Sequence, residues 1–444
     1  AYTPTINMAD PQNDARGGAI YNYNASVTVN NCDFINNFAL NGNDINTGSS
    51  YGGSIYNDHQ GILGVFNSTF RNNIATGEGG AIFNWEIISV NDSFFTDNFA
   101  HTGGAISSYN NADVNRCTFL NNVAFDSGYG AGGAIHNNGV LNVNASFFIN
   151  NTAAINGGAI DNGGACTING TGFINNTATG TGLYEGGGAI HHLSVNLPLV
   201  ICFSSFSGNN ALNGYNIHCS GVSTILDANY NWWGTNSGPQ GIISSYGSLN
   251  SWPTTWLYMT FTANPAVILS GQTSQLTANF NNYYNGNTVT PIDPALGHLP
   301  DSSPVTFTTD LGNVGSKTTI VNTTNGTAQA TLNTNESLGT AHLSAQLDSQ
   351  ILYKNAEITF NINQIIAAAA VFKNSVDTNH ALPSNVLVGG KTVTTPQFLE
   401  LMVNAVIQLN KGLPTTTTIG LGTFNGATNP KESIVAGSMG KAEY

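Results

Sequence analysis

The sequence predicts a mainly β chain made of a right-handed parallel β-helix, a β-sandwich and a small helical module, in that order. A Gly-Gly-Ala/Ser-Ile motif occurs seven times in the first half of the 444 residues. It is followed by a region of alternating apolar and polar residues and then by a region with a helical period. We place the three parts at residues 1–256, 257–363 and 364–412, with a linker at 413–444. The glycine motif begins at Gly17, Gly52, Gly79, Gly103, Gly132, Gly157 and Gly187.

Each glycine motif is followed by a phenylalanine with repeating neighbours. The residues seven and five positions before it are apolar, the residue two before is small, and Asn and Ala lie three and five positions after it. Apolar residues with a period of two are typical of β-strands. We therefore expect coils of three short strands that stack about 4.8 Å apart. The phenylalanines are Phe34, Phe70, Phe95, Phe119, Phe148, Phe173 and Phe206.

Stacked coils place like residues on like, so the repeat predicts a ladder of Asn side chains along the rod. Their amides would hydrogen-bond along the axis and satisfy backbone groups at the corners. The glycine pair is expected where the chain turns with positive φ. The ladder residues are Asn37, Asn73, Asn98, Asn122, Asn151, Asn176 and Asn209.

The five cysteines are an odd number, so at least one is unpaired within the chain. Cys32 and Cys117 occupy the small inward position three coils apart, about 14 Å, which is too far for a disulfide. We predict that they are small apolar fillers of the core, and Cys166 also falls on an inward position. Only Cys202 with Cys219 is a pair to test as a disulfide.

Insertions are confined to one edge of the predicted rod. The spacing from the Asn ladder to the next glycine motif varies from 5 to 15 residues, whereas the spacing from each motif to its phenylalanine varies only from 13 to 16. Such an edge is the usual place for a binding face. Aromatic rings beside carboxylates suit sugar binding, although these tyrosines could equally serve only to hold the loops. The candidate glycan-binding residues are Tyr51, Phe125, Tyr129, Tyr184, Asp126 and Glu185, with Asp44 in the first loop.

A further ladder follows the Ile of each glycine motif and is expected to point outward. His136, Asp161 and His191 fall on consecutive coils of it. Two imidazoles that flank a carboxylate could hold a divalent metal, but about 10 Å would separate them, too far for shared ligation. We therefore expect a solvated His/Asp group and no metal site. The ladder is Tyr21, Tyr56, Phe83, Ser107, His136, Asp161 and His191.

The rod is predicted to end at Trp232 and Trp233, whose indoles would close the hydrophobic column. Composition changes after Trp256, and short alternating strands separated by turns indicate an antiparallel sandwich. The strings PVTF at 304–307 and DLG at 310–312 resemble the bacterial immunoglobulin-like modules of surface proteins. This resemblance implies an Ig-like stalk. The clearest strands are predicted at 327–332, 341–347 and 356–362.

Residues 364–411 have a helical period, which an extended segment interrupts after Leu382-Pro383, and Thr395-Pro396 begins a second helix. The residue order resembles the pseudomurein-binding repeat of methanogen surface proteins, and the tail GSMGKAEY resembles the opening of a following copy. The strings GGAIYN and NYNWWGTNSGP likewise resemble the adhesin-like β-helix proteins of methanogenic archaea. The resemblance implies a wall-binding motif of Leu382, Pro383, Val388, Gly389, Gly390, Pro396, Phe398 and Leu399.

Composition excludes several partners. The formal net charge is −14 and no lysine precedes Lys317, so nucleic acid and anionic lipid are not expected to bind. The longest apolar run, 365–372, is too short to span a bilayer. The first residues have neither the basic start nor the apolar stretch of a signal peptide and are interpreted as a mature end. Sequons typical of exported proteins occur at Asn24, Asn67, Asn91, Asn144, Asn150, Asn169, Asn175, Asn322, Asn325 and Asn335.

These features lead to three hypotheses about function. The first is a cell-surface adhesin-like protein held noncovalently to pseudomurein, whose β-helix presents a binding face to glycans or other cells. The second is a β-helix polysaccharide lyase or hydrolase, which needs clustered carboxylates and usually a cation. The third is a structural wall or filament subunit, or a virus-encoded fibre, with self-association along the rod. The fixed cations of the rod are few, namely Arg16, Arg71 and Arg116, so we do not expect an enzyme. We also expect no cofactor.

Overall fold

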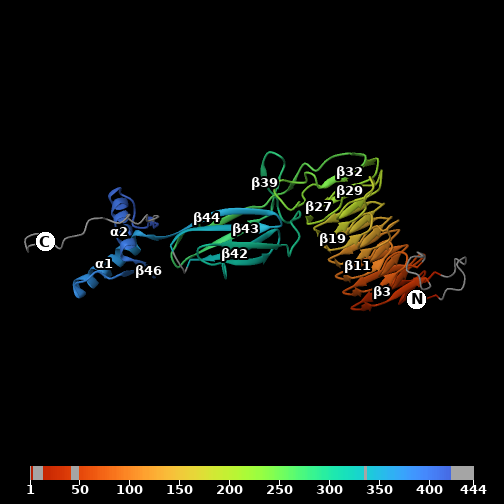
Figure 1. Ribbon diagram of the computed structural model, residues 1–444, viewed down its shortest axis with the longest axis horizontal. Coiled ribbons are helices and arrows are strands. Elements are labelled where there is room, and N and C mark those ends of the chain that lie inside the picture. The colour runs from red at the N-terminus through yellow and green to blue at the C-terminus, as the bar shows by residue number, and fades with distance from the viewer. Residues whose placement is uncertain (1, 4–13, 42–49, 335–337, 422–444) are drawn as a thin grey trace, which may run out of the picture.

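The computed structural model describes residues 2–3, 14–41, 50–334 and 338–421. The described parts lie in a row: a parallel β-helix, then sheets that are mainly antiparallel, then two helices (Figure 1). The predicted mainly β fold with a parallel β-helix is confirmed. Each part has its own cluster of buried hydrophobic residues. The domain boundaries given above stay predictions.

Six coils in the described part of the β-helix each contribute four strands, not the three expected, and the strands of successive coils pair in parallel. These coils begin at Ile20, Ile55, Ile82, Ile106, Ile135 and Ile160. The fourth strand is the short Asn-x-Ala segment, which the sequence placed in a corner. We name the four sheets by a residue that recurs in each. The Ile sheet is β2 (Ile20–Asn22), β6 (Ile55–Asn57), β10 (Ile82–Asn84), β14 (Ile106–Ser108), β18 (Ile135–Asn137), β22 (Ile160–Asn162), β26 (Ile190–His192), β29 (Ile217–Cys219) and β32 (Ile243–Ser245).

The other three sheets follow in the order of the chain within a coil. The Val sheet is β3 (Ser26–Asn30), β7 (Ile62–Phe66), β11 (Ile87–Asn91), β15 (Ala112–Asn115), β19 (Leu141–Asn144), β23 (Cys166–Asn169), β27 (Leu199–Cys202) and β31 (Leu226–Asp227). The Phe sheet is β4 (Asp33–Ile35), β8 (Thr69–Arg71), β12 (Phe94–Thr96), β16 (Thr118–Leu120), β20 (Phe147–Ile149), β24 (Gly172–Ile174) and β28 (Ser205–Ser207). The Ala sheet is β1 (Tyr2–Thr3), β5 (Phe38–Asn41), β9 (Ile74–Ala75), β13 (Phe99–Ala100), β17 (Val123–Ala124), β21 (Thr152–Ala153) and β25 (Thr177–Ala178), and beyond these sheets β30 (Ser223–Thr224) pairs with β33 (Ser248–Leu249).

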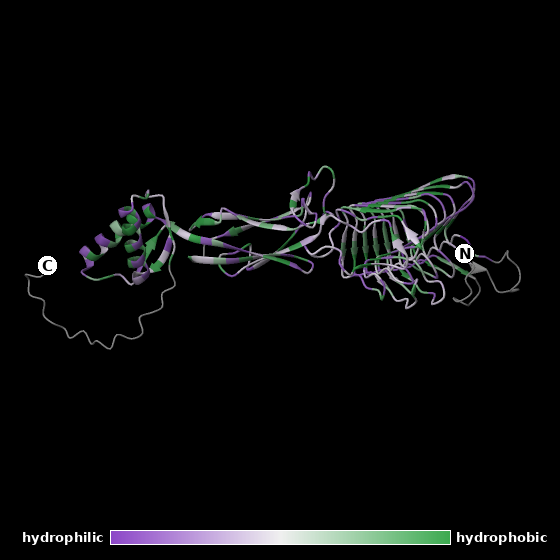
Figure 2. Cartoon of the chain, turned by 90° about the horizontal axis from the view of Figure 1, so that it is seen from above, coloured by the Kyte–Doolittle hydropathy of each residue, from purple (hydrophilic) through white to green (hydrophobic). Residues whose placement is uncertain are grey.

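The interior of the rod is a set of stacked ladders, as the repeat predicts. The seven phenylalanines form one continuous stack with ring centroids 4.7 to 5.1 Å apart. Figure 2 shows that similar hydropathy recurs at matching positions of successive coils. In the Asn ladder, the side-chain oxygen of Asn98 accepts from the backbone and side-chain nitrogens of Asn73, and its nitrogen donates to Asn122 and to the Phe70 carbonyl. Every polar atom of this buried amide is therefore satisfied.

Asn fills two further positions that the sequence reading missed. The residue before each ladder amide sits at the corner between the Phe and Ala sheets with positive φ, as Asn36, Asn72 and Asn121 do. Asn tolerates this left-handed conformation better than most residues. A second buried ladder ends the strands of the Ile sheet, where Asn57 donates to Asn84 over 2.7 Å. Asn thus recurs at three positions of the repeat, each with its own role.

The glycine motif turns the chain into the Ile sheet. The first glycine of each motif has a φ between 59° and 73°, which confirms the predicted positive φ. The second glycine is required for a different reason. A Cβ on Gly80 would lie 2.1 Å from the carbonyl oxygen of Gly104 on the next coil. The backbones of neighbouring coils therefore approach too closely at this position for any side chain.

The cysteine predictions are partly wrong. Cys117 and Cys166 are buried in the core as expected, but Cys32, on the first of these coils, is exposed. All five cysteines are free, so the Cys202–Cys219 disulfide does not form. These two residues lie in different sheets of the rod, on strands β27 and β29.

The two tryptophans at the end of the rod point into different cores. Trp233 stacks on Phe206 at 4.8 Å and closes the phenylalanine column as predicted. Trp232 instead belongs to the core of the following part, where it meets Phe280 edge-on at 5.2 Å. Its indole N–H donates to Asp348, 2.7 Å away. The pair therefore joins the rod to the next part.

That next part consists of sheets that enclose one hydrophobic core. One sheet contains β35 (Thr260–Asn264), β37 (Thr273–Asn279) and β42 (Thr327–Asn333). A larger one contains β36 (Val267–Leu269), β44 (Gln350–Asn361), β43 (Gly339–Leu347), β40 (Pro304–Thr309) and β41 (Thr318–Asn322). A small sheet near the rod contains β34 (Trp256–Leu257), β38 (Asn282–Tyr284) and β39 (Val289–Pro291).

The C-terminal module contains α1 (Ile362–Asn379), the hairpin β45 (Asn385–Val388) and β46 (Lys391–Thr394), and α2 (Thr395–Asn410). Both helices begin with a capping box, formed by Asn361 and Gln364 in α1 and by Thr394 and Gln397 in α2. The chain then returns as β47 (Thr418–Ile419), which pairs with β44. The predicted extended turn between the helices is thus a hairpin.

Candidate functional site

The structure separates the six candidate glycan-binding residues of the variable loops. Tyr129 and Tyr184 are well exposed, at 80% and 54%, but they lie on different loops. Tyr51 turns inward and packs on Phe83, with 4.9 Å between the ring centroids. Glu185 accepts from the backbone N–H of Gly182 within its own loop. Asp44 lies outside the described residues.

Phe125 and Asp126 form a small aromatic and acidic hollow. The Phe125 ring stacks on Phe99 at 4.2 Å and meets the edge of His101. Asp126 lies 3.5 Å from Nδ1 of His101 and accepts from the backbone N–H of Gly128. The cavity measures about 160 Å³. It combines a ring with a carboxylate, as a sugar site would, but both groups also hold the loop in place.

The carboxylate of Asp161 joins two histidines on neighbouring coils. Its oxygens lie 2.8 Å from Nδ1 of His136 and 2.5 Å from Nδ1 of His191. Asp161 and His191 are buried, so the expected solvated group is wrong. The loop before Gly187 crosses this part of the Ile sheet, where Tyr184 packs against Tyr246 with 4.3 Å between the ring centroids.

These contacts keep Asp161 ionised. Burial alone would raise the pKa of its carboxyl, but the hydrogen bonds from His136 and His191 hold that pKa well below its usual range. Burial opposes protonation of His136, yet the hydrogen bond to Asp161 and the charge of that carboxylate raise the pKa of this imidazole. Among the described residues, no group of three or more His, Cys, Asp or Glu side chains is arranged to hold a metal ion.

The network continues from His191 to a serine. Nε2 of His191 lies 2.8 Å from Oγ of Ser220, so Asp161, His191 and Ser220 make the order of contacts found in serine hydrolases. A nucleophile must reach its substrate, whereas Ser220 is only 4% exposed. We interpret these three residues as a polar core beneath the loop.

Two further histidines extend the buried polar region. Burial lowers the pKa of His192 to about 4, because the neutral ring is favoured away from water. Burial likewise lowers the pKa of His218 to about 4. The ring of His218 stacks on His191 at 5.7 Å. Both imidazoles are therefore neutral at pH 7.

The sequence reading missed an aromatic surface on the outer face of the Ile sheet. Tyr21, Tyr23 and Trp85 are all more than two fifths exposed, and Trp85 packs against Tyr109 with ring centroids 4.6 Å apart. The available signal was the residue three positions after the Ile of each glycine motif. This position is on the same outward side as the ladder that begins at Tyr21, and its residue type changes from coil to coil.

The residues of the predicted wall-binding motif divide into two groups. Val388 and Phe398 are fully buried and serve the core of the module. Gly389 and Gly390 form the hairpin turn with φ of 53° and 83°, and Pro396 lies in the first turn of α2. Two large side chains of the motif remain exposed and available for contact, those of Leu382 and Leu399, with Pro383 half-buried beside them.

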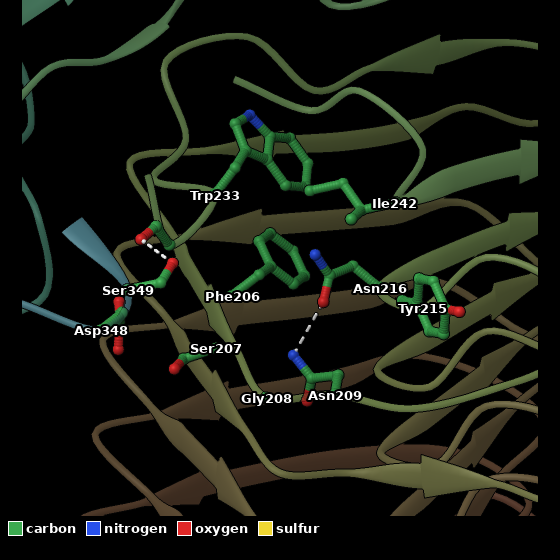
Figure 3. Close-up of a pocket in the computed structure, with 11 residues that line it drawn as sticks. Phe206, Ser207, Gly208, Asn209, Tyr215, Asn216, Trp233, Ile242, Asp348 and Ser349 are labelled. Atoms are coloured by element: carbon green, nitrogen blue, oxygen red, sulfur yellow. Dashed lines mark hydrogen bonds between the residues drawn. The ribbon is translucent and has the colours of Figure 1, made fainter. Parts of the chain in front are cut away.

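A cavity of about 280 Å³ lies where the rod meets the next part, between Phe206, Trp233 and the turn at Asp348 and Ser349 (Figure 3). The Phe sheet ends here, and this turn between β43 and β44 lies over the last coil. Ser349 donates to the carbonyl of Gly234, which holds the turn in place. The cavity is thus part of a joint between two bodies.

Among the predicted sequons, most are on the surface of the rod or of the following sheets. Asn91 and Asn144 are partly buried and donate to Ser89 and Asn115. Asn335 lies outside the described residues. The exposed sequon residues are Asn24, Asn67, Asn150, Asn169, Asn175, Asn322 and Asn325.

No helix in the described part of the chain is both long and apolar enough to cross a membrane. A family model described as the Chlamydia polymorphic membrane protein repeat matches residues 67–84. This stretch contains Phe70, Asn73 and the glycine motif at Gly79, so it includes the recurring residues of one coil. No curated protein matches the chain.

Among solved structures, the chain is similar to a C-terminal 282-residue fragment of intimin, in complex with the intimin-binding domain of the translocated intimin receptor. The identity is 24%, over 23% of this chain and 33% of that chain, and the TM-score is 0.17. The match thus spans a third of the fragment. Because the TM-score is this low, we infer neither fold nor function from it. The comparisons therefore identify a polymorphic-membrane-protein-type repeat in the β-helix.

Proposed function

We propose that this chain is a cell-surface adhesin-like protein, with a β-helical head, an Ig-like spacer and a C-terminal module that binds pseudomurein noncovalently. The observation that carries the proposal is the arrangement of the parts: the outer faces of the β-helix and the module lie at opposite ends of an elongated chain (Figure 1). A protein anchored at one end and binding at the other needs this separation. The repeat in residues 67–84, described for a membrane protein of Chlamydia, supports a surface location.

Sedimentation with purified pseudomurein sacculi tests the anchor. The chain is expected to co-sediment weakly, because it holds one whole module, and a chain extended by further C-terminal copies is expected to co-sediment strongly. Replacing Leu382 and Leu399 with Ser should abolish sedimentation while the hairpin and helices stay folded, since both side chains are exposed. Failure of both the chain and its extended form to sediment would sink the proposed anchor.

The proposal also holds that the protein is not an enzyme. A β-helix lyase or hydrolase needs accessible carboxylates paired for proton transfer. Asp161 is buried and bound to two histidines, and Asp126 is bound within its own loop. Release of reducing ends or unsaturated sugars from a cell-surface glycan would overturn this part of the proposal.

A structural fibre or wall subunit is the other candidate. It is favoured by the repeated core, in which like rings stack on like from Phe34 and Phe70 onward, because such a stack can continue from one copy of the chain to the next. Light scattering against protein concentration distinguishes the two, because a fibre subunit grows end to end whereas an adhesin stays at one mass.

A further inference from the structure

A row of side chains runs along the outer face of the Ile sheet in the first four of these coils. Tyr23, Asp58, Trp85 and Tyr109 occupy matching positions, each three residues after the Ile of its glycine motif. The backbone N–H groups of Asp58, Trp85 and Tyr109 bond to the preceding coil, so the register continues through these residues. Neighbours in the row are therefore about 4.8 Å apart. We call these four residues together with Tyr21 the aromatic ridge.

The rings of the ridge are held in place from below. Tyr21 stacks on Tyr56 at 5.4 Å, and Tyr56 in turn stacks on Phe83 at 5.1 Å. The indole of Trp85 meets Phe83 edge-on, at 78°, and its N–H donates to the Tyr56 hydroxyl over 2.9 Å. Rings that are fixed before binding lose little conformational entropy when a ligand arrives.

These rings nevertheless remain open to solvent. Tyr23 is 58% exposed and Trp85 is 43% exposed, although the indole N–H of Trp85 is already bonded. The exposed part of Trp85 is therefore mainly ring carbon. Grouped apolar surface of this kind, rimmed by polar residues, is typical of binding sites on soluble proteins.

Carboxylates lie within and beside the ridge. Asp58 accepts from the Tyr21 hydroxyl and from the backbone N–H of His59. Each of its oxygens has a further lone pair. Glu86 lies next to the row, where it accepts from Asn110 at 3.3 Å and lies 3.8 Å from His59. The surface therefore alternates flat rings with hydrogen-bond acceptors.

We propose that the aromatic ridge binds a neutral or amine-bearing saccharide chain that lies along the rod. Sugar rings offer C–H faces that stack on aromatic rings, and their hydroxyl or amino groups donate to carboxylates such as Asp58 and Glu86. The distance from Tyr23 to Trp85 is two strand spacings, about 10 Å, which suits a chain of linked hexoses. This inference rests on the proposed binding function of the β-helix and moves its site from the loops to the ridge.

The charge of the surface selects this ligand class. Arg16 lies over the Tyr56 ring, but its guanidinium is 3.7 Å from the carboxylate of Asp14. Asp58, Glu86 and the net negative charge of the chain would therefore repel acidic polysaccharides. An apolar protein surface would cover the remaining lone pairs of Asp58 and Glu86 without giving them donors, which is unfavourable. A hydroxyl-rich or amine-bearing chain instead offers donors to those lone pairs.

Titration of the full chain with cellotetraose, chitotetraose, a chitosan tetramer and tetragalacturonate, followed by calorimetry, tests the proposal. At least one neutral or amine-bearing probe should bind, and tetragalacturonate should not. Trp85→Ala should weaken binding at least tenfold, and Tyr23→Ala by a smaller factor. Trp252→Ala is the matched control, because Trp252 is 55% exposed on the last part of the rod and should leave binding unchanged. Thermal unfolding of each variant confirms that the rod is intact.

Three results would overturn the proposal: no probe binds, only the acidic probe binds, or Trp252→Ala weakens binding as much as Trp85→Ala. Loss of concentration-dependent light scattering in Trp85→Ala without any sugar binding would make a second copy of the chain the occupant. The sacculus assay is read separately, because it reports on the C-terminal module and not on the β-helix. If no saccharide binds while the chain still co-sediments with sacculi, the ridge assignment fails and the proposed anchor stands.

Discussion

The β-helix and the sheets that follow it build their cores in opposite ways. In the rod, each inward residue meets its own copy on the next coil, as Phe95 meets Phe119 and Asn98 meets Asn122. In the following part, contacts join residues far apart in the sequence, such as Trp232 with Phe280 and with Asp348. A repeated core satisfies each polar group by stacking, whereas a non-repeated core needs a specific partner for each.

This difference predicts how mutations change the stability of each part. The largest effect is expected from substitutions that leave a cavity in a core. Phe119→Ala removes the middle ring of the stack and should lower the free energy of unfolding of the rod by about 3–5 kcal/mol. Phe307→Ala should lower that of the following part by a similar amount, since Phe307 is fully buried there. Scanning calorimetry should show that each variant shifts a different transition, because the two cores are separate clusters. A single transition shifted equally by both variants would contradict the comparison.

The next effect concerns the amide ladder. Asn122→Ala removes the acceptor of Asn98 and a donor to Asn151 and to the Phe95 carbonyl, so each of these buried groups loses one hydrogen bond. We expect a loss of about 2–4 kcal/mol, measured by denaturant unfolding of the rod. Asn111→Ala is the control, because that residue is exposed, and its effect should stay within about 0.5 kcal/mol. Equal losses in both variants would show that the ladder adds no stability.

His192 occupies a position of the second buried ladder, 2.8 Å from the side chain of Asn162, and should make the rod sensitive to acid. The pKa of His192 is lowered to about 4 in the folded chain. Between pH 6.5 and pH 4 the unfolded chain therefore binds more protons than the folded chain, and the free energy of unfolding decreases as the pH is lowered. The loss reaches about 3 kcal/mol. The raised pKa of His136 acts in the opposite sense and offsets part of it, since that contribution is present at low pH and is lost as pH rises.

His192→Asn tests this assignment, because it restores the residue found at the same position in Asn162 and Asn137. The free energy of unfolding is measured at pH 7 and at pH 4.5. The decrease between the two pH values should be about 2 kcal/mol smaller in the variant than in the unmodified chain. His59→Asn, at an exposed position, should leave the difference unchanged. An unchanged pH dependence in His192→Asn would show that His218 or other groups control it.

The smallest effect is expected at the joint between the two parts. Asp348→Ala removes the acceptor of the Trp232 indole N–H, a loss of about 1–2 kcal/mol. Small-angle scattering should then show a more variable angle between rod and sheets. Asp310→Ala, on the same group of sheets but away from the rod, is the control. If the angle between rod and sheets is unchanged in Asp348→Ala, apolar packing of Trp232 alone maintains the joint.

Features that repeat in every coil could be predicted from the sequence. Features that depend on one particular contact in the folded chain could not. The phenylalanine stack, the first Asn ladder and the positive φ of the first glycine were predicted because each occurs in seven copies at a fixed spacing. The fourth strand was missed because Ile74–Ala75 is too short to show a period. The aromatic ridge was missed because Tyr23, Asp58 and Trp85 differ in type, and only their register shows that they form one row.

By itself, the sequence determined the stacked architecture, since a periodic chain buries its apolar face only against copies of itself. It also indicated two helices and the start of the second at Thr395-Pro396, because helical period and helix starts are local signals. Only the tertiary structure decided that Asp161 is buried between two histidines, that Trp232 joins the next core and that Trp85 faces solvent. Burial and partners at these positions depend on loops and strands distant in sequence, and no local pattern encodes them.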